Sequence, residues 1–309
     1  MVCILASLCY IAAYDDTPLS IRQMSTDHAD RLVRSVLGGL LSSGRPTPFC
    51  TGDTCHDPLC PAHNEQAMRD ILARTPELSM VSESDIDLAR MIDHTLLKAE
   101  ATLDDVERLC AEAAEHRFAS VCVNPLFVPR AVSILRRSPV KVGTVVGFPL
   151  GATTTTSKRH EAGQSLADGA QELDMVIAVG LLKSGALPEV RADIETVAAA
   201  AHAHSGICKV ILETALLTDE EKIRASMIAQ LAEADFVKTS TGFSKGGATP
   251  DDVALLRRVV GRSLGVKASG GIRTRADALV MIAHGASRIG TSSGVSIVQR
   301  PDEAQPEGG

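Results

Sequence analysis

The chain has 309 residues, 45% of them hydrophobic, so it can bury a sizeable core in one large α/β domain with an appendage, or in two small domains. Its formal net charge of −7 and its pI near 5.7 argue against broad binding to nucleic acid or to anionic membranes, because those partners reward a basic surface. We therefore expect no nucleic-acid and no membrane partner, and any phosphate site must be local.

The first residues, MVCILASLCYIAAYDD, contain a short apolar run but no Lys or Arg before it, whereas a secretory signal normally begins with positive charge. No apolar run approaches the ~20 residues that span a bilayer. Cys110, Cys122 and Cys208 are scattered through the apolar part of the chain, where reduced and buried cysteines are usual. These features favour a cytoplasmic protein over an exported one.

Residues 1–85 show no sustained periodicity and include turn-rich stretches such as SSGRPTPFCTGDTCHDPLCPAHN, from Ser42 to Asn64. We therefore predict that they form a poorly ordered, flexible N-terminal extension. An alternative is that translation begins later, at Met68 or Met80, so that most of this segment is never made.

The extension contains a group of cysteine and histidine residues with the spacing C-x4-C-x4-C-x2-H, formed by Cys50, Cys55, Cys60 and His63, with His56 nearby. Three thiolates and an imidazole could close a tetrahedral zinc site. The spacing is not one of the usual zinc-finger patterns, and no flanking strand or helix is predicted to hold the ligands. We therefore favour a metal-free extension over a zinc-binding one.

From about Ser84 the sequence alternates regularly between short apolar, β-branched runs and longer amphipathic stretches rich in Ala, Leu, Glu and Arg. Such runs are typical of buried strands. Eight runs can be counted: MIDHTLL (from Met91), SVCVNP (Ser120), KVGTVVGFP (Lys141), ELDMVIAVG (Glu172), CKVILETALL (Cys208), DFVKTST (Asp235), GVKASGGI (Gly265) and SRIGTSSG (Ser287).

Four of the stretches between the runs have clear helix starts, with an N-cap hydroxyl followed by proline or acidic residues: Thr102, Thr218, Thr249 and Thr274. Strands flanked on both sides by helices indicate parallel pairing buried on both faces. Eight units in residues 86–299 match a closed (β/α)8 TIM barrel, and the polar residues 300–309 read as a disordered tail. An open doubly wound sheet is the second choice, because no G-x-G-x-x-G opens an early helix.

Three charged residues interrupt strand-like runs: Asp174, Lys238 and Lys267. The two lysines are about one βα unit apart, so we expect them on the sixth and seventh strands at similar height. Two ammonium groups held close together repel, and this repulsion lowers the pKa of one of them. A neutral, desolvated amine can attack a carbonyl carbon and form a Schiff base.

Asp174, on the fourth strand, would then carry protons with the help of a water molecule. The alternative for this residue is a simple salt bridge to one lysine inside the barrel. The presence of all three charges together favours chemistry.

Two turns rich in Gly and Ser follow the last two strands, SGG at Ser269–Gly271 and GTSSG at Gly290–Gly294. Barrels usually hold phosphate in the loops after strands 7 and 8, where backbone N–H groups point at the anion. With the turn after the sixth strand, the predicted phosphate and substrate site comprises Thr241, Gly242, Gly270, Gly271, Ser292 and Ser293. Lys245 could add charge, although a solvated surface lysine is an equal alternative.

At this point the sequence resembles the deoxyribose-phosphate aldolase family, the class I aldolases of the deoC type. The resemblance covers about Asp85 to Gln299 and rests on IDHTLL, VCVNP, VGFPLGA, ELDMVIAVG, FVKTSTGFSKGGAT, VKASGGIR and GTSSG, in the family's order. The N-terminal extension lies outside it.

The resemblance implies that Lys238 is the Schiff-base lysine, that Lys267 tunes it and shares in proton transfer, and that Asp174 donates and accepts protons. The implied reaction is the reversible cleavage of 2-deoxy-D-ribose 5-phosphate to D-glyceraldehyde 3-phosphate and acetaldehyde, in deoxyribonucleoside catabolism. It needs no cofactor, and a homodimer is expected.

Other family positions have less defined roles. Asp93 is expected to support the lysines or to be structural. Cys122 would face the pocket or the helix layer, depending on strand register, and we favour a small buried residue over a nucleophile. Glu213 and Thr214 are expected at the mouth, and His94 as a packed or hydrogen-bonded histidine.

Two alternatives to the implied function remain. A different Schiff-base lyase, or a transaldolase-like enzyme, would keep Lys238 but act on another sugar phosphate. A non-catalytic sugar-phosphate sensor would bind without turnover, yet it would have no need for a lysine with a depressed pKa.

Overall fold

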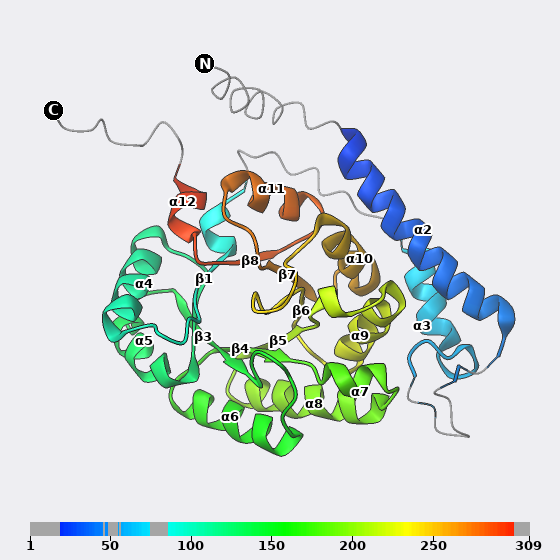
Figure 1. The fold of residues 1–309 in the computed structure, drawn as a ribbon, viewed down its shortest axis with the longest axis horizontal. Helices are drawn as coiled ribbons and strands as arrows, with labels where there is room; N and C mark the ends of the chain where they lie inside the picture. Colours follow the sequence, from blue (N-terminus) through cyan, green and yellow to red (C-terminus); the bar gives the residue numbers. More distant parts are fainter. Residues whose placement is uncertain (1–18, 46, 49–54, 56, 75–85, 300–309) are drawn as a thin grey trace.

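The computed structural model describes residues 19–45, 47–48, 55, 57–74 and 86–299, and the predicted tail 300–309 lies outside them. Eight parallel strands close into a barrel in chain order, surrounded by an outer ring of helices (Figure 1). The predicted (β/α)8 barrel is therefore confirmed, and the open doubly wound sheet is excluded.

The strands lie within or almost within the eight predicted runs. They are β1 Ile92–Leu96, β2 Ser120–Val123, β3 Lys141–Val146, β4 Glu172–Val176, β5 Ile207–Ile211, β6 Phe236–Lys238, β7 Gly265–Ser269 and β8 Arg288–Thr291. All pairs are parallel, and Lys238 on β6 is the direct Cα partner of Lys267 on β7. The expectation that these two lysines stand at the same height is confirmed.

The barrel helices are α4 Leu103–His116, α5 Val128–Leu135, α6 Thr155–Ala167, α7 Val179–Lys183, α8 Leu187–Ala203, α9 Asp219–Leu231, α10 Pro250–Val260, α11 Arg275–Ala283 and α12 Gly294–Val298, with 3-10 turns η2 Leu88–Met91, η3 Pro125–Phe127 and η4 Thr214–Leu216. Four of the barrel helices, α4, α9, α10 and α11, begin directly after the threonines that the sequence predicts as N-caps. Thr102, Thr218, Thr249 and Thr274 each accept a backbone N–H from three residues on, which stabilises the first helical turn. No helix in the described ranges is both long and apolar enough to cross a bilayer.

Successive side chains along each strand point alternately toward the surrounding helices and toward the barrel interior. On β4, Leu173 and Met175 belong to the large apolar core under the helices, whereas Asp174 lies in the barrel interior. A smaller apolar cluster, which includes Cys122 and Val145, is separate from that outer core. The strands therefore turn mainly apolar side chains toward the helices, whereas the interior contains the charged residues together with this small apolar cluster.

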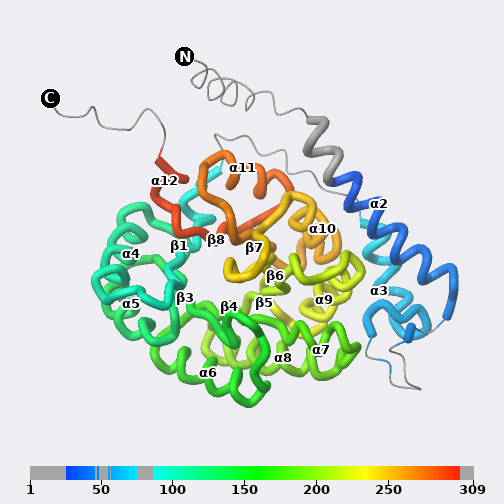
Figure 2. Tube along the Cα trace, in the orientation of Figure 1, coloured from blue at the N-terminus to red at the C-terminus, as the bar shows by residue number. Residues whose placement is uncertain are grey.

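The described part of the N-terminal extension is helical, which differs from the poorly ordered segment that the sequence favours. Helices α2 (Leu19–Ser43) and α3 (Pro61–Ala73) lie along the outer side of α9 and α10 (Figures 1 and 2). Ala29, Val33 and Leu37 recur every four residues and form one buried stripe of α2. This stripe packs against the outward faces of the two barrel helices, through side chains that include Met227 and Leu255.

A buried charge fixes the same contact. Arg258 of α10 lies 2.7 Å from the carboxylate of Asp30 on α2 and also donates to the backbone carbonyl of Ile71 on α3. The outer faces of α9 and α10 are apolar, and α2 and α3 shield them from water. The sequence of the extension, read alone, does not reveal this partner surface.

Candidate active site

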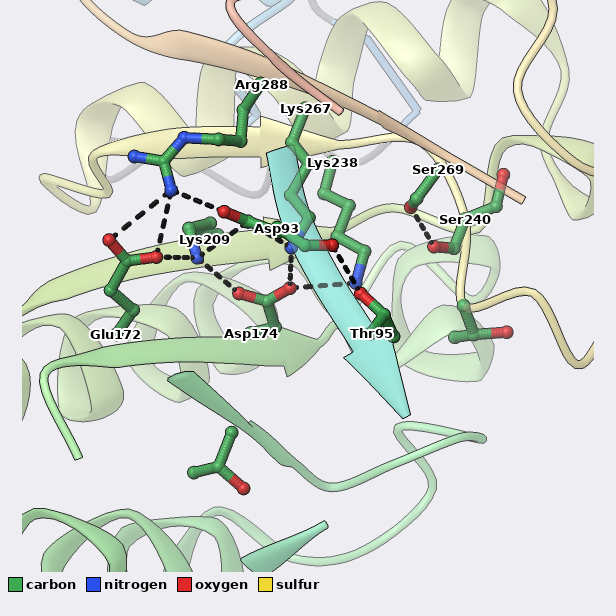
Figure 3. Close-up of polar contacts among 12 residues, drawn as sticks. Asp93, Thr95, Glu172, Asp174, Lys209, Lys238, Ser240, Lys267, Ser269 and Arg288 are labelled. Atoms are coloured by element: carbon green, nitrogen blue, oxygen red, sulfur yellow. Dashed lines mark hydrogen bonds and ion pairs between the residues drawn. The ribbon is translucent and has the colours of Figure 1, made fainter. Parts of the chain in front are cut away.

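Lys238 ends β6 with its side chain inside the barrel and is only 2% exposed. Its Nζ lies 2.8 Å from Oδ2 of Asp174, on β4 (Figure 3). The apolar pair Phe236 and Val237 before it belongs to the strand, so the lysine reaches the interior through the backbone alternation alone.

Lys267 is completely buried on β7, and its Nζ lies 2.6 Å from the same carboxylate oxygen of Asp174. Asp174 therefore bridges both lysines and is not restricted to a salt bridge with one of them. Gly290 on β8 makes room for Lys267, since a Cβ at that position would lie 2.9 Å from the lysine Cε.

Three further charged residues, Lys209, Glu172 and Arg288, join this cluster and were missed by the sequence reasoning. Lys209 of β5 lies 2.9 Å from the second oxygen of Asp174 and 2.5 Å from Glu172. Arg288 of β8 donates to Glu172 at 3.1 Å and to Asp93 at 2.6 Å. Lys209 interrupts an apolar run as Lys238 does, so the same signal could have found it.

Asp93, which the sequence offered as supporting or structural, is fully buried in this cluster. One of its oxygens lies 2.6 Å from Nζ of Lys267, and the other accepts the hydroxyl of Ser120 at 2.6 Å. It therefore gives the ammonium of Lys267 a second carboxylate partner besides Asp174.

The charges of the cluster explain why one amine can be neutral. Among the described residues it comprises three carboxylates and four basic groups: Asp93, Glu172, Asp174, Lys209, Lys238, Lys267 and Arg288. A net charge inside a barrel is costly, so the cluster is balanced when one lysine gives up its proton.

The pKa shifts identify that lysine as Lys238. Burial, reinforced by the nearby ammonium of Lys267, lowers the pKa of Lys238 even against the attraction of Asp174. For Lys267 burial acts in the same direction, but Asp174 and Asp93 outweigh it and raise its pKa. Burial opposes ionisation of Asp174, yet the three lysines around it hold its pKa well below the usual range. The resting site thus contains an ionised carboxylate beside an amine that loses its proton readily.

The predicted phosphate residues lie in the loops after β6, β7 and β8, at the carboxyl ends of the strands. Gly242, Gly270 and Gly271 have φ of 85°, 89° and 84°, a region that favours glycine, so these turns depend on the absence of a side chain. Gly270 also contacts Gly247 so closely that a Cβ on Gly247 would lie 2.2 Å from its carbonyl oxygen. The two loops therefore form one surface at the mouth.

The hydroxyl residues of the mouth differ in their contacts. Thr241 is buried, and its hydroxyl donates to Glu213 at 2.5 Å, so this side chain holds the β6 loop to the end of β5. Ser292 is exposed, and Ser293 donates its backbone N–H to Thr291 before the short helix α12. Lys245 is exposed in the β6 loop.

Two other predicted residues take structural places. Cys122 is buried beside Leu97 and Val145, and burial together with Asp174 raises the pKa of its thiol to about 11, so it is not a thiolate nucleophile at neutral pH. His94 points outward from β1, where its Nε2 lies 2.7 Å from Glu112 of α4. Thr214 is buried next to Glu213 in the 3-10 turn η4.

Within the part of the chain that the structure describes, one group of cysteine, histidine and carboxylate side chains has the spacing of a metal site. It consists of Cys55, Cys60 and His63, in the N-terminal extension and not in the barrel. Cys50, the fourth member of the sequence motif, lies outside the described residues.

Comparison with known proteins identifies the family of the chain. Residues 88–300 match the model of the DeoC/LacD family aldolases. A protein of Carboxydothermus hydrogenoformans named deoxyribose-phosphate aldolase is 58% identical over 222 residues, which cover 71% of this chain and 96% of that protein.

Solved structures give the same result. The crystal structure of a putative deoxyribose-phosphate aldolase from Coccidioides immitis, 37% identical, covers 87% of this chain and 96% of its own, with a TM-score of 0.68. That coverage reaches beyond residues 88–300. The deoxyribose phosphate aldolase of Aeropyrum pernix, described as a tetramer, is 34% identical with a TM-score of 0.64 and covers 75% of this chain and 95% of its own. The chain belongs to the DeoC/LacD family of aldolases.

Proposed function

We propose that the protein is a class I deoxyribose-phosphate aldolase that cleaves 2-deoxy-D-ribose 5-phosphate reversibly to D-glyceraldehyde 3-phosphate and acetaldehyde. The observation that carries this proposal is Asp174, whose Oδ2 lies 2.8 Å from Lys238 and 2.6 Å from Lys267 in a fully buried cluster. The similarity to proteins named deoxyribose-phosphate aldolase supports the choice of substrate.

In the proposed mechanism the neutral amine of Lys238 attacks the aldehyde carbon of the open-chain sugar and forms a carbinolamine. Loss of water gives a protonated imine, which acts as an electron sink. Removal of the proton from the C3 hydroxyl then breaks the C2–C3 bond, releases glyceraldehyde 3-phosphate and leaves an enamine. Protonation of the enamine at C2 and hydrolysis of the imine release acetaldehyde and restore the amine.

The proton transfers are assigned to Asp174 and Lys267. Because its pKa lies well below the usual range, Asp174 begins the cycle as a carboxylate and therefore acts first as a proton acceptor, through a water molecule. Lys267 begins as an ammonium ion, held by Asp174 and Asp93, and can donate.

We assign the substrate phosphate to the turns after β6, β7 and β8, with Gly270, Gly271, Ser292 and Ser293 as the main backbone and hydroxyl donors. Thr241 and Gly242 shape the neighbouring loop. A homodimer and a cytoplasmic location also stay predictions, and light scattering of the purified protein will test the first, for which the Aeropyrum pernix relative offers a tetramer as the alternative.

The substrate is tested by measuring acetaldehyde release from a panel of sugar phosphates. We expect 2-deoxy-D-ribose 5-phosphate to give the highest kcat/KM, and unphosphorylated 2-deoxy-D-ribose to fall about 100-fold or more below it, since remote binding energy supports the chemical step. A higher kcat/KM for another sugar phosphate would favour the transaldolase-like alternative. Binding without turnover would favour the sensor.

The pH dependence tests the electrostatic role of Lys267. Only the neutral amine attacks, so the rate of adduct formation with acetaldehyde should rise with pH through the lowered pKa of Lys238 and then level off. In Lys267→Met the repelling ammonium is gone and Asp174 acts more strongly on Lys238, so its pKa rises. We expect the rising limb to move by roughly one pH unit or more to higher pH.

The measurement is the initial rate of borohydride-trapped adduct at a series of pH values. Lys141→Met, at an exposed lysine at the start of β3, serves as the control and should leave the profile in place. A Lys267→Met profile that coincides with that of the control would contradict the role given to Lys267.

A further inference from the structure

Three potential metal ligands come together in the N-terminal extension, outside the catalytic barrel. The sulfur atoms of Cys55 and Cys60 and a ring nitrogen of His63 all lie within 4.8 Å of one another. Cys60 is buried and Cys55 half-buried, so the group sits at the edge of the packed part of the extension. We propose that Cys55, Cys60 and His63 bind a zinc ion with a structural role.

The separation of the ligand atoms fits a shared metal ion. A sulfur bound to zinc at ~2.3 Å and a nitrogen bound at ~2.0 Å lie about 3.5 Å apart in tetrahedral geometry. Sγ of Cys60 and Nδ1 of His63 are 3.6 Å apart, with the two residues three positions apart at the start of α3. One ion can therefore reach both atoms without a change of backbone.

The loop that carries the ligands is held in place by contacts with the folded protein. The sequence alone predicts no flanking strand or helix to hold these ligands, and the structure provides that support. Asp57 is completely buried between Cys55 and Cys60, and its carboxylate accepts from Arg224 of α9 at 3.1 Å and from the backbone of Leu59 at 3.0 Å. Its carbonyl oxygen accepts the backbone N–H of Cys60 at 3.0 Å. The ligands are thus placed by a loop anchored to the outside of the barrel.

The donor set selects the kind of metal. Two thiolates and an imidazole are soft and borderline ligands that suit zinc, whereas calcium and magnesium require oxygen ligands. Two thiolates also balance the charge of a divalent ion. Structural zinc has four ligands, of which Cys55, Cys60 and His63 would supply three.

The position of the group indicates what the ion would do. Cys60 is the N-cap residue of α3, whose buried side chains Met68 and Ile71 pack with α9 and α10. A metal bound here would tie the loop to the first turn of α3 and fasten the extension to the barrel. The catalytic lysines lie inside the barrel, on the other side of the helix layer, so the ion would take no part in the aldol chemistry.

Metal analysis of the full-length protein tests this proposal. Protein grown with added zinc and dialysed against a weak chelator should retain one zinc per chain, whereas Cys60→Ser and His63→Ala should lose at least about ten-fold in occupancy. Cys110→Ala, at a buried thiol of α4, is the matched control and should keep its zinc. Cobalt substitution gives a second readout, since tetrahedral cobalt–thiolate absorption should appear in the unaltered protein and disappear in Cys60→Ser.

Aldolase turnover of each variant, which we expect to be retained, shows that the barrel is folded in the samples compared. Full-length protein without stoichiometric zinc would overturn the proposal, as would zinc that persists when Cys55, Cys60 and His63 are all replaced. A disulfide between Cys55 and Cys60 in the fresh protein, located by mass spectrometry of unreduced peptides, would overturn it as well. None of these results bears on the assignment of the substrate or of Lys238.

Discussion

Replacement of Lys238 by alanine is expected to lower kcat by at least about 10⁴-fold, because the amine that bonds to the substrate is gone and the neighbouring lysine cannot replace it. Lys267 is fully buried between Asp93 and Asp174, which raise its pKa and keep it protonated. The loss should appear in kcat/KM for 2-deoxy-D-ribose 5-phosphate and in the synthesis direction alike, since both pass through the same imine.

The fold of the variant should survive. Removing Lys238 removes the fourth basic group and leaves three carboxylates facing three cations, so the cluster stays balanced. The free energy of unfolding, measured with denaturant, should therefore fall by less than is usual when a buried side chain is replaced. Lys141→Ala, at an exposed lysine on β3, provides the control for the loss of an amine elsewhere. Turnover within ten-fold of the unaltered protein in Lys238→Ala would show that the nucleophile is misassigned.

Replacement of Asp174 by asparagine should have a different profile. Proton transfer slows when the carboxylate is neutralised, so we expect kcat to fall by about 10² to 10⁴-fold. Lys238 retains its amine, so borohydride should still trap an acetaldehyde adduct on it at long incubation times. A lower kcat with a preserved adduct would separate proton transfer from covalent bonding.

The same change should destabilise the protein. Asp174 accepts from Lys209, Lys238 and Lys267, and its neutralisation leaves buried ammonium groups with too few carboxylates. We expect the free energy of unfolding to fall by about 3 kcal/mol or more.

Asp193→Asn supplies the matched control for this stability effect. Asp193 is also buried, and it pairs with the buried Lys158 outside the catalytic cluster. Its replacement should reduce stability comparably but leave kcat close to that of the unaltered enzyme. Equal losses of kcat in the two variants would mean that Asp174 acts through stability alone.

Much of the barrel can be predicted from the sequence because its signals are local. A threonine N-cap followed by acidic residues specifies a helix start within a few residues, and Thr102 and Thr274 show this with complete capping boxes. The spacing between Lys238 and Lys267 is also readable, because one βα unit moves the chain to the next strand at the same height.

The rest of the site depends on barrel closure, which no local pattern contains. Arg288 on β8 reaches Glu172 on β4 across the interior, at a separation of 116 residues. The sequence shows that Arg288 is charged, but it does not show that Glu172 is its partner. The position of one oxygen of Asp174 between two ammonium groups likewise follows from the curvature of the strands.

The extension shows a different limit. The stripe Ala29, Val33 and Leu37 has helical spacing, but its surroundings are polar, and its partner surface on α9 and α10 is recognisable only once the barrel places those helices side by side. Tertiary packing, and not local propensity, orders this segment.

The most direct test of the proposed chemistry is to incubate the unaltered protein with acetaldehyde, reduce it with borohydride and locate the adduct by peptide mass spectrometry. The reduced imine should be found on Lys238 at close to one per chain, with Lys209 and Lys267 unmodified. A reduced adduct on Lys267 in place of Lys238, or no adduct in protein that turns over the substrate, would contradict the assignment of Lys238 as the Schiff-base lysine.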